Sequence, residues 1–413
     1  MTIFDYHNNQ LMAEDVPLSE IANNVGTPVY VYSKAAFTGR LNEMEAAFKD
    51  IPHLICFAVK TCANLSLLKL VAEQNQGADI VSGGELFKAL RGNINPGRVV
   101  FSGVGKTEKE IQEALTAGIL MFNAESEEEI DLLGQTAGRL GKTAQVTVRV
   151  NPDVDAKTHP YISTGLKDNK FGISREKALA VYRKIADNHN LEAVGIACHI
   201  GSQLTDVAPL LEAADRMMTL ALELKAAGHS LKYFDMGGGL GVCYNDETPP
   251  SLSDYAQGLK KILQKAPEMT LIVEPGRFVA ANSAVLLTKV LYNKENGGRN
   301  FVVADAAMND LTRPSLYGAF HAIKPLVRTG AEEITVDVVG PVCESTDFLV
   351  KNRSLPKVNA NDVLAVMSAG AYGFTMSSNY NARVRAAEVL VDGAEYRIIK
   401  PRETYEDLIK GEE

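Results

Sequence analysis

Charged residues and glycines gather where short apolar segments of this sequence end. Lys60 closes the apolar run HLICFAVK, and a lysine partly removed from water can present the free amine that a Schiff base requires. The run DMGGG (235–239) lacks Cβ atoms over three residues, so its backbone N–H groups can approach a phosphate closely. Glu274 and Arg277 lie three residues apart in EPGR, where one can face a pyridine nitrogen and the other a phosphate. Together these motifs favour a site for a phosphorylated pyridine cofactor.

A further polar motif is His199-Ile-Gly-Ser202. It can place a flat imidazole against a cofactor ring, with Ser202 donating to the phosphate. It has no metal partners at ligand spacing, so we expect no metal site. Each motif also has a structural interpretation: a solvated lysine, a core histidine, a plain glycine turn or a surface ion pair. DMGGGLG is not the dinucleotide-binding fingerprint, because Val242 stands where that spacing needs glycine.

The elements that must position these motifs are strands alternating with amphipathic helices. Between them lie stretches such as LSLLKLVAEQ and EKALAVYRKIADN, with apolar residues at helical spacing. Eight strands each followed by a helix predict a (β/α)8 barrel, whose active-site groups lie at the carboxyl ends of the strands. The predicted strands are 53–60, 78–84, 98–105, 119–126, 144–152, 193–202, 232–239 and 270–277.

After residue 281 the pattern changes to strand-like segments separated by Gly, Pro and Asn, which predicts a mostly β domain. We therefore expect an N-terminal segment (1–30) that completes the β domain, a barrel domain (31–281) and a C-terminal β domain (282–413). The segment PVYVYS is expected to join the β domain from the N-terminal side.

Composition restricts the class of protein. The 413 residues are 46% hydrophobic and 23% charged, which is typical of a globular protein with a large core. A net charge of -9 without any Lys/Arg run argues against nucleic acid as a partner. No secretory signal and no membrane-length apolar run is visible. Five cysteines without a CxxC pair fit a reducing cytoplasm.

Many segments in the same order carry a resemblance that spans nearly the whole chain. They resemble the fold-type III pyridoxal-phosphate decarboxylases, and within them most closely the diaminopimelate decarboxylase family. That resemblance implies an alanine racemase-like, cofactor-binding barrel. The resembling segments are FAVKTCAN, ADIVSGGEL, NPDVDAKTHPYISTGLKDNKFGI (151–173), CHIGSQ, DMGGGLG, EPGR, RPSLY (313–317), GPVCESTD (340–347) and GAYG (370–373).

The resemblance implies a role for each matching residue. Lys60 would hold pyridoxal 5'-phosphate, and Cys343 would be the proton donor, supplied by the partner subunit of a homodimer with shared active sites. His199 would stack on the pyridine ring and Glu274 would pair with its nitrogen. The remaining cofactor-binding residues would be Ser202, Gly237, Gly238, Gly239, Pro275, Gly276, Arg277 and Tyr372. The substrate contacts would be Arg277, Arg313, Tyr317, Glu344 and Tyr372.

The implied reaction is decarboxylation of meso-2,6-diaminopimelate to L-lysine, the last step of lysine biosynthesis. Meso-diaminopimelate carries a second amino-acid head. Arg313 can hold the distal carboxylate in a bidentate fork, Tyr317 can add a donor, and Glu344 can accept the ammonium.

Other interpretations stay open. Arg313 can be a structural ion pair in a decarboxylase of ornithine or lysine. A non-catalytic regulatory homologue would be expected to lose some of Lys60, Cys343 and Tyr372, all of which are present. An amino-acid racemase is disfavoured by GPVCESTD and by the Arg313/Tyr317 pair. Lys170 can reach Asp347 of a partner subunit, although a solvated loop lysine is the simpler expectation.

Overall fold

The computed structural model describes residues 4–155 and 170–412. The chain divides into two compact units, which we call the barrel unit and the β unit. The barrel unit contains Leu41–Val242 and Thr248–Phe278. The β unit contains Met1–Arg40, Cys243–Glu247 and Val279–Glu413.

The barrel unit is a closed parallel sheet. The predicted eight-stranded barrel is therefore confirmed, since the strands pair in the order β5-β6-β7-β8-β9-β11-β12-β13 and β13 returns to β5. A ninth, two-residue strand, β10 (Ile173–Ser174), pairs with β9 on the outside of this circuit. The barrel strands are β5 (His53–Ala58), β6 (Gly77–Ile80), β7 (Val99–Phe101), β8 (Met121–Ala124), β9 (Ala144–Asn151), β11 (Leu191–Ala197), β12 (Tyr233–Asp235) and β13 (Thr270–Val273).

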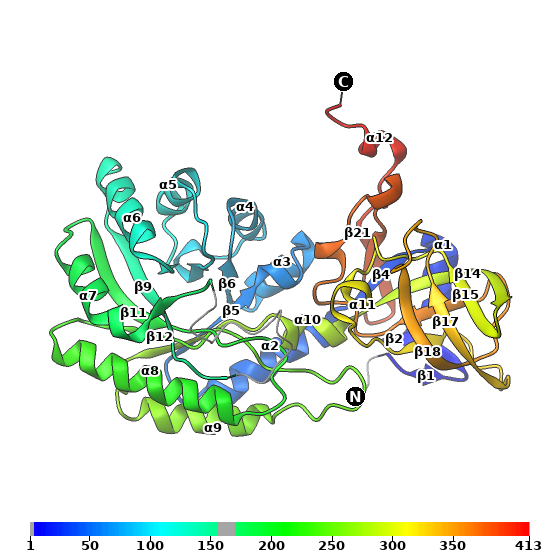
Figure 1. Ribbon diagram of the computed structural model, residues 1–413, viewed down its shortest axis with the longest axis horizontal. Coiled ribbons are helices and arrows are strands. Elements are labelled where there is room, and N and C mark those ends of the chain that lie inside the picture. The colour runs from blue at the N-terminus through cyan, green and yellow to red at the C-terminus, as the bar shows by residue number, and fades with distance from the viewer. Residues whose placement is uncertain (1–3, 156–169, 413) are drawn as a thin grey trace. The chain divides into compact units, whose positions relative to one another are not determined.

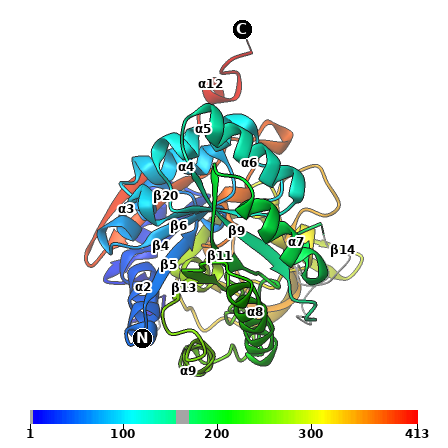
Figure 2. The same ribbon diagram turned by 90° about the vertical axis from the view of Figure 1, so that its left-hand side faces the viewer.

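A helix follows each barrel strand, and Figure 2 shows α3 to α9 running around the outside of the strands. Several of these helices begin with a polar N-cap residue. Thr107 forms a capping box with Glu110, and Ser82 and Ser126 accept backbone N–H bonds at their helix starts. The helices are α2 (Lys34–Phe48), α3 (Leu65–Glu73), α4 (Gly83–Arg91), α5 (Glu108–Ala117), α6 (Glu127–Arg139), α7 (Arg175–Ala186), α8 (Ala208–Ala226), α9 (Leu252–Leu263) and α10 (Arg277–Ala280).

The barrel strands are buried on both faces, which explains their continuous apolar sequences. Phe57, Phe101, Phe122 and Phe234 are fully buried, and the rings of Phe101 and Phe122 stack with centroids 6.0 Å apart. This packing fixes the strands, and the strands in turn fix where the loops at their carboxyl ends begin.

The β unit contains a mixed sheet whose main path runs β18-β17-β15-β14-β4-β20-β21. Figure 1 shows β14, β15, β17 and β18 side by side. The segment PVYVYS contributes β4, which pairs with β14 antiparallel and with β20 parallel. The strands are β4 (Val29–Ser33), β14 (Ala284–Asn296), β15 (Arg299–Ala304), β16 (Ile323–Pro325), β17 (Glu333–Val339), β18 (Phe348–Pro356), β19 (Val363–Val366), β20 (Ala387–Asp392) and β21 (Glu395–Lys400).

Smaller elements complete the β unit. A three-stranded sheet of β1 (Tyr6–His7), β2 (Gln10–Ala13) and β3 (Val16–Pro17) precedes helix α1 (Leu18–Val25). Two short helices, α11 (Arg313–Tyr317) and α12 (Tyr405–Leu408), lie later in the chain. Within residues 4–155 and 170–412, no helix combines the length and apolar character needed to span a membrane.

Candidate active site

Lys60 lies in a single 3₁₀ turn, Val59–Thr61, directly after β5. The sequence placed it as the last residue of that strand, and the strand ends two residues earlier, at Ala58. Its ammonium donates to Oδ2 of Asp79, at the end of the neighbouring strand β6. Asp79 is fully buried whereas the Lys60 side chain is 37% exposed, so the amine is anchored at one side and accessible at the other.

The loop after β12 holds Gly237, Gly238 and Gly239 in a conformation that other residues would not tolerate. Gly237 and Gly239 have φ of +62° and +123°. A Cβ on Gly238 would lie 2.4 Å from the carbonyl oxygen of Glu274. The three glycines therefore add no side chains of their own that would block the close approach of a phosphate.

Ser202 and Arg277 come together in the barrel unit, although 75 residues separate them. Both Nε and Nη2 of Arg277 donate to Ser202 Oγ, each at 3.2 Å. Arg277 is buried and begins helix α10. Just before it, Pro275 accepts a backbone hydrogen bond from Ala58, and a Cβ on Gly276 would lie 2.4 Å from the Thr61 side chain. These contacts hold the EPGR segment against the turn that carries Lys60.

His199 follows β11 and is held as a neutral imidazole. Burial, together with the positive charge of Arg149, lowers the pKa of His199 to about 3. Arg149 is itself fixed by Glu125, with Nη1 2.8 Å from Oε1. A neutral flat ring is the form suited to stacking on an aromatic cofactor.

Glu274 belongs to a buried pair of carboxyl groups. It hydrogen-bonds to Asp235, at the end of β12, and Asn123 Nδ2 donates to both, at 2.9 Å to Asp235 Oδ2 and 3.3 Å to Glu274 Oε1. Burial raises the pKa of Asp235 to about 6. Burial and the neighbouring carboxylates of Asp235 and Asp79 raise the pKa of Glu274 well above its usual range.

The other predicted residues lie in the β unit, where Arg313 begins α11. Its Nη1 lies 2.9 Å from Nε2 of the fully buried His321, whose Nδ1 lies 2.8 Å from the carbonyl oxygen of Met367. The guanidinium carbon stands 4.6 Å from the centre of the Tyr244 ring. Arg313 is thus fixed by a histidine and an aromatic ring.

Cys343 and Glu344 occupy an exposed loop after β17. Asp347 organises this loop, because its two carboxylate oxygens accept the backbone N–H groups of Met308 and Val342, each at 2.7 Å. The Cys343 N–H donates to Asn381 Oδ1 at 2.8 Å. The Cys343 thiol therefore lies on a loop whose backbone is fixed by hydrogen bonds.

The remaining predicted residues are placed as follows. Tyr317 ends α11 and is half-buried. Tyr372 is half-buried and has φ of +56°, a strained conformation for tyrosine. Lys170 is exposed, with Nζ 5.2 Å from the ring centre of Phe171. Most of segment 151–173, namely 156–169, lies outside the described residues.

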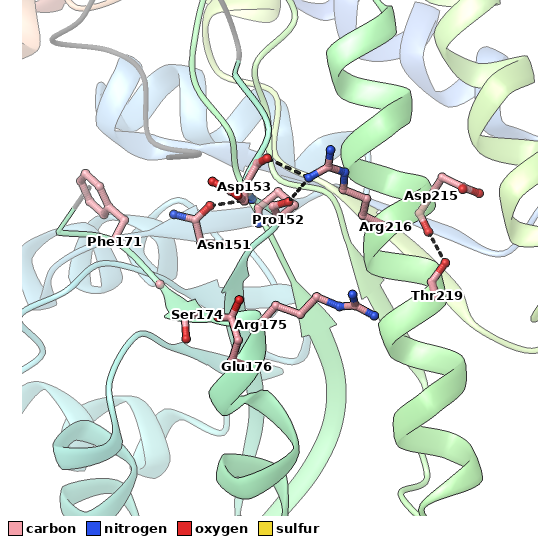
Figure 3. Close-up of a pocket in the computed structure, with 11 residues that line it drawn as sticks. Asn151, Pro152, Asp153, Phe171, Ser174, Arg175, Glu176, Asp215, Arg216 and Thr219 are labelled. Carbon is pink, nitrogen blue, oxygen red and sulfur yellow. Dashed lines mark hydrogen bonds between the residues drawn. The ribbon is translucent and has the colours of Figure 1, made fainter. Parts of the chain in front are cut away.

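A pocket of about 360 Å³ lies in the barrel unit. Figure 3 shows its lining residues beside the N-terminus of α7 and one face of α8. Arg216 on α8 donates from Nη1 to the carbonyl oxygens of Pro152 and Asp153, at 3.0 and 2.8 Å. None of the residues predicted to bind the cofactor or the substrate lines this pocket.

Sequence reasoning assigned no role to several residues that hold the site together. Asp79, Asn123 and Asp235 were visible as polar residues at strand ends, and that position was the available signal. His321 and Tyr244 had no comparable signal, because neither lies in a motif nor at a predicted barrel-strand end. Their contact with Arg313 depends on the folded path of the chain.

The grouped residues match the chemical groups of pyridoxal phosphate. The barrel unit offers an amine (Lys60) for the aldehyde and an acid (Glu274) for the ring nitrogen. It also offers a glycine cradle with a hydroxyl and a guanidinium for the phosphate.

Comparisons with known proteins agree with this chemistry. Residues 34–281 match the family described as "Pyridoxal-dependent decarboxylase, pyridoxal binding domain". The chain is 50% identical to diaminopimelate decarboxylase of Haemophilus influenzae, over 99% of this chain and 98% of the relative. These matches confirm the predicted cofactor and the predicted carboxy-lyase class.

Solved structures give the same result for the fold. Diaminopimelate decarboxylase from Helicobacter pylori, complexed with L-lysine, is 44% identical with a TM-score of 0.93, covering 96% of this chain and 99% of that one. The enzyme from M. jannaschii, also in complex with L-lysine, is 38% identical with a TM-score of 0.94, covering 98% and 96%.

Proposed function

This chain belongs to the diaminopimelate decarboxylase family, and from that premise we propose that it converts meso-2,6-diaminopimelate to L-lysine and carbon dioxide, the last step of lysine biosynthesis. The observation that carries the proposal is that relatives named diaminopimelate decarboxylase are about 50% identical to this chain over nearly its full length. The contacts of Lys60 with Asp79 and of Arg277 with Ser202, all in the barrel unit, support the proposal.

The barrel unit supplies most of the residues that we propose to bind the cofactor. Pyridoxal phosphate, when bound, supplies an electron sink for the pair released as the Cα carboxylate leaves. Lys60 would hold it covalently, His199 would stack on its ring, and Glu274 would pair with the ring nitrogen. The phosphate would be received by Ser202, Gly237, Gly238, Gly239 and Arg277, and Tyr372 would reach it as well. Pro275 and Gly276 complete the proposed cofactor-binding set.

The β unit supplies groups for the substrate. Arg313 takes the distal carboxylate in a bidentate fork, Tyr317 adds a donor and Glu344 accepts the distal ammonium. Arg277 and Tyr372 contribute to the substrate site. A substrate that lacks the distal carboxylate cannot make the bidentate contact with the buried Arg313, so it is bound more weakly than meso-diaminopimelate.

Reprotonation at Cα is assigned to the Cys343 thiol. This exposed residue comes from the partner subunit of a homodimer with shared active sites. Lys60 is the competing proton donor. We place the protein in the cytoplasm, since all five cysteines are free thiols.

The function is tested by measuring carbon dioxide release by the protein loaded with pyridoxal phosphate, separately with meso-diaminopimelate, L-ornithine and L-lysine. We expect release from meso-diaminopimelate and far lower kcat/KM for the two amino acids without a distal carboxylate. A higher kcat/KM with ornithine or lysine would contradict the role of Arg313 and support a diamine-forming decarboxylase.

A further inference from the structure

We propose that Asp235 is a positioning residue which, with Glu274, holds one shared proton before the cofactor binds, and that this proton passes to the pyridine nitrogen on binding. The inference rests on the proposed role of Glu274 toward the ring nitrogen. The proton balance is simple: the O–H bond of the Glu274 acid breaks, an N–H bond to the ring forms, and Glu274 becomes a carboxylate.

The backbone fixes the two carboxyl groups beside each other. Asp235 ends β12 and pairs in register with Ile272 of β13, and Glu274 follows that strand directly. The Glu274 N–H donates to the carbonyl oxygen of Gly237 at 2.8 Å. The pair is therefore built into two adjacent barrel strands.

Asn123 fixes the positions of the two carboxyl groups. Its side-chain N–H₂ donates to both carboxyl groups and also to Ser102 Oγ, at 3.1 Å. Its oxygen accepts from Thr147 Oγ1, which fixes the orientation of the amide. Asn123 and Thr147 are buried, so bulk water does not replace these bonds.

One proton on the pair follows from its surroundings. Asp235 and Glu274 are 1% and 8% exposed, and two adjacent buried carboxyl groups cannot both ionise. The charged groups facing Glu274 are the carboxylates of Asp235 and Asp79 and the ammonium of Lys60. The neighbouring Cys56, Cys198 and Tyr255 have pKa values raised by burial and remain neutral.

The hydrogen bonds indicate which member carries the proton. Asp235 accepts from the Gly237 N–H and from the Asn123 amide, each at 2.9 Å, whereas the Asn123 contact to Glu274 is longer, at 3.3 Å, so Asp235 is the ionised member. Glu274 is then the acid, and its proton is available for the ring nitrogen. After the transfer, both Asp235 and Glu274 are carboxylates. Two negative charges beside the protonated ring nitrogen, instead of one, favour the pyridinium form.

The test is the number of protons taken up when pyridoxal phosphate binds to the cofactor-free protein. We compare wild type with Asp235→Asn by calorimetry in buffers of different ionisation enthalpy, between about pH 7 and 8.5. The amide does not repel Glu274 and can donate an N–H bond to it, so the pKa of Glu274 is lower in the variant than in wild type, although burial still raises it. The variant should therefore take up more protons than wild type when the cofactor binds, up to one, and its Kd should rise more steeply with pH.

A cofactor analogue whose ring nitrogen is replaced by carbon is the matched control, and the difference between the two proteins should vanish with it. Equal proton uptake by wild type and Asp235→Asn would overturn the proposal. So would a difference that persists with the analogue. Absence of decarboxylation by wild type would instead contradict the proposed function, and proton uptake does not depend on that result.

Infrared difference spectroscopy of wild type gives a second readout that requires no substitution. With carbon-13 in the glutamate carboxyl groups, a shifted band of a buried protonated carboxyl should disappear when pyridoxal phosphate binds and persist with the analogue. Absence of that band from the cofactor-free protein would refute the shared proton.

Discussion

Two contacts of Arg313, with His321 and with Tyr244, are made by groups that carry no negative charge. His321 Nε2 has to accept the hydrogen bond from Arg313, so the ring proton is on Nδ1 and points to the carbonyl oxygen of Met367, 2.8 Å away. The Tyr244 ring lies 4.6 Å from the guanidinium carbon and makes an edge contact with His321. At the residue scale, the proposed specificity of the enzyme therefore depends on a neutral histidine of one tautomer.

Replacing His321 with Phe is expected to raise KM for meso-diaminopimelate roughly 10- to 100-fold while kcat changes little. A hydrogen bond to a charged group contributes about 1.5–3 kcal/mol, and its loss acts on binding of the distal carboxylate through Arg313. Steady-state kinetics measures this split. His321→Gln keeps an acceptor and should recover part of the affinity. Equal KM values for the folded Phe and Gln variants would show that the acceptor is irrelevant.

At the scale of elements, the loop after β12 has to combine tight packing with an open backbone. Gly238 is enclosed by the Glu274 carbonyl group, whereas Gly105, in the exposed loop after β7, has no atom within 4 Å of an added Cβ. The same substitution therefore has different consequences at these two positions.

Gly238→Ala is expected to weaken binding of pyridoxal phosphate by at least tenfold, because the new Cβ would lie 2.4 Å from the Glu274 oxygen and displace the loop. Equilibrium binding to the cofactor-free protein measures this. Gly105→Ala is the matched control and should bind as wild type does. Wild-type affinity in the Gly238 variant would mean that this loop does not bind the phosphate.

The barrel could be predicted from sequence because its strands are buried on both faces and read as separate apolar runs. Position at a strand end was also the reason for predicting roles for Lys60, His199 and Glu274. The side-chain pairings could not be predicted. Asn123 lies 112 residues from Asp235, and only the closure of the sheet brings β8 and β12 to the same interior. Spacing along the chain holds no information on such contacts.

At the scale of the whole molecule, the proposed catalytic residues belong to two separately packed units. Lys60 lies in the barrel unit, and Cys343 lies in the β unit on a loop braced by Asp347. We propose that the two residues of one active site come from different subunits, which makes each subunit alone incomplete.

Mixing Lys60→Ala and Cys343→Ala proteins under conditions of subunit exchange should restore activity. In a two-fold dimer, half of the exchanged dimers are mixed and each has one intact site, so about a quarter of wild-type activity is expected. Carbon dioxide release from meso-diaminopimelate measures the recovery. No recovery after exchange has been verified by mass spectrometry would contradict a shared site.

The most direct test of the central claim is to identify the residue that carries the cofactor. The protein loaded with pyridoxal phosphate is treated with borohydride, digested and analysed by mass spectrometry, while decarboxylase activity is followed in parallel. We predict one modified peptide, with the added mass on Lys60, and loss of activity in step with its formation. Modification of another lysine, or full activity after complete modification of Lys60, would contradict the account.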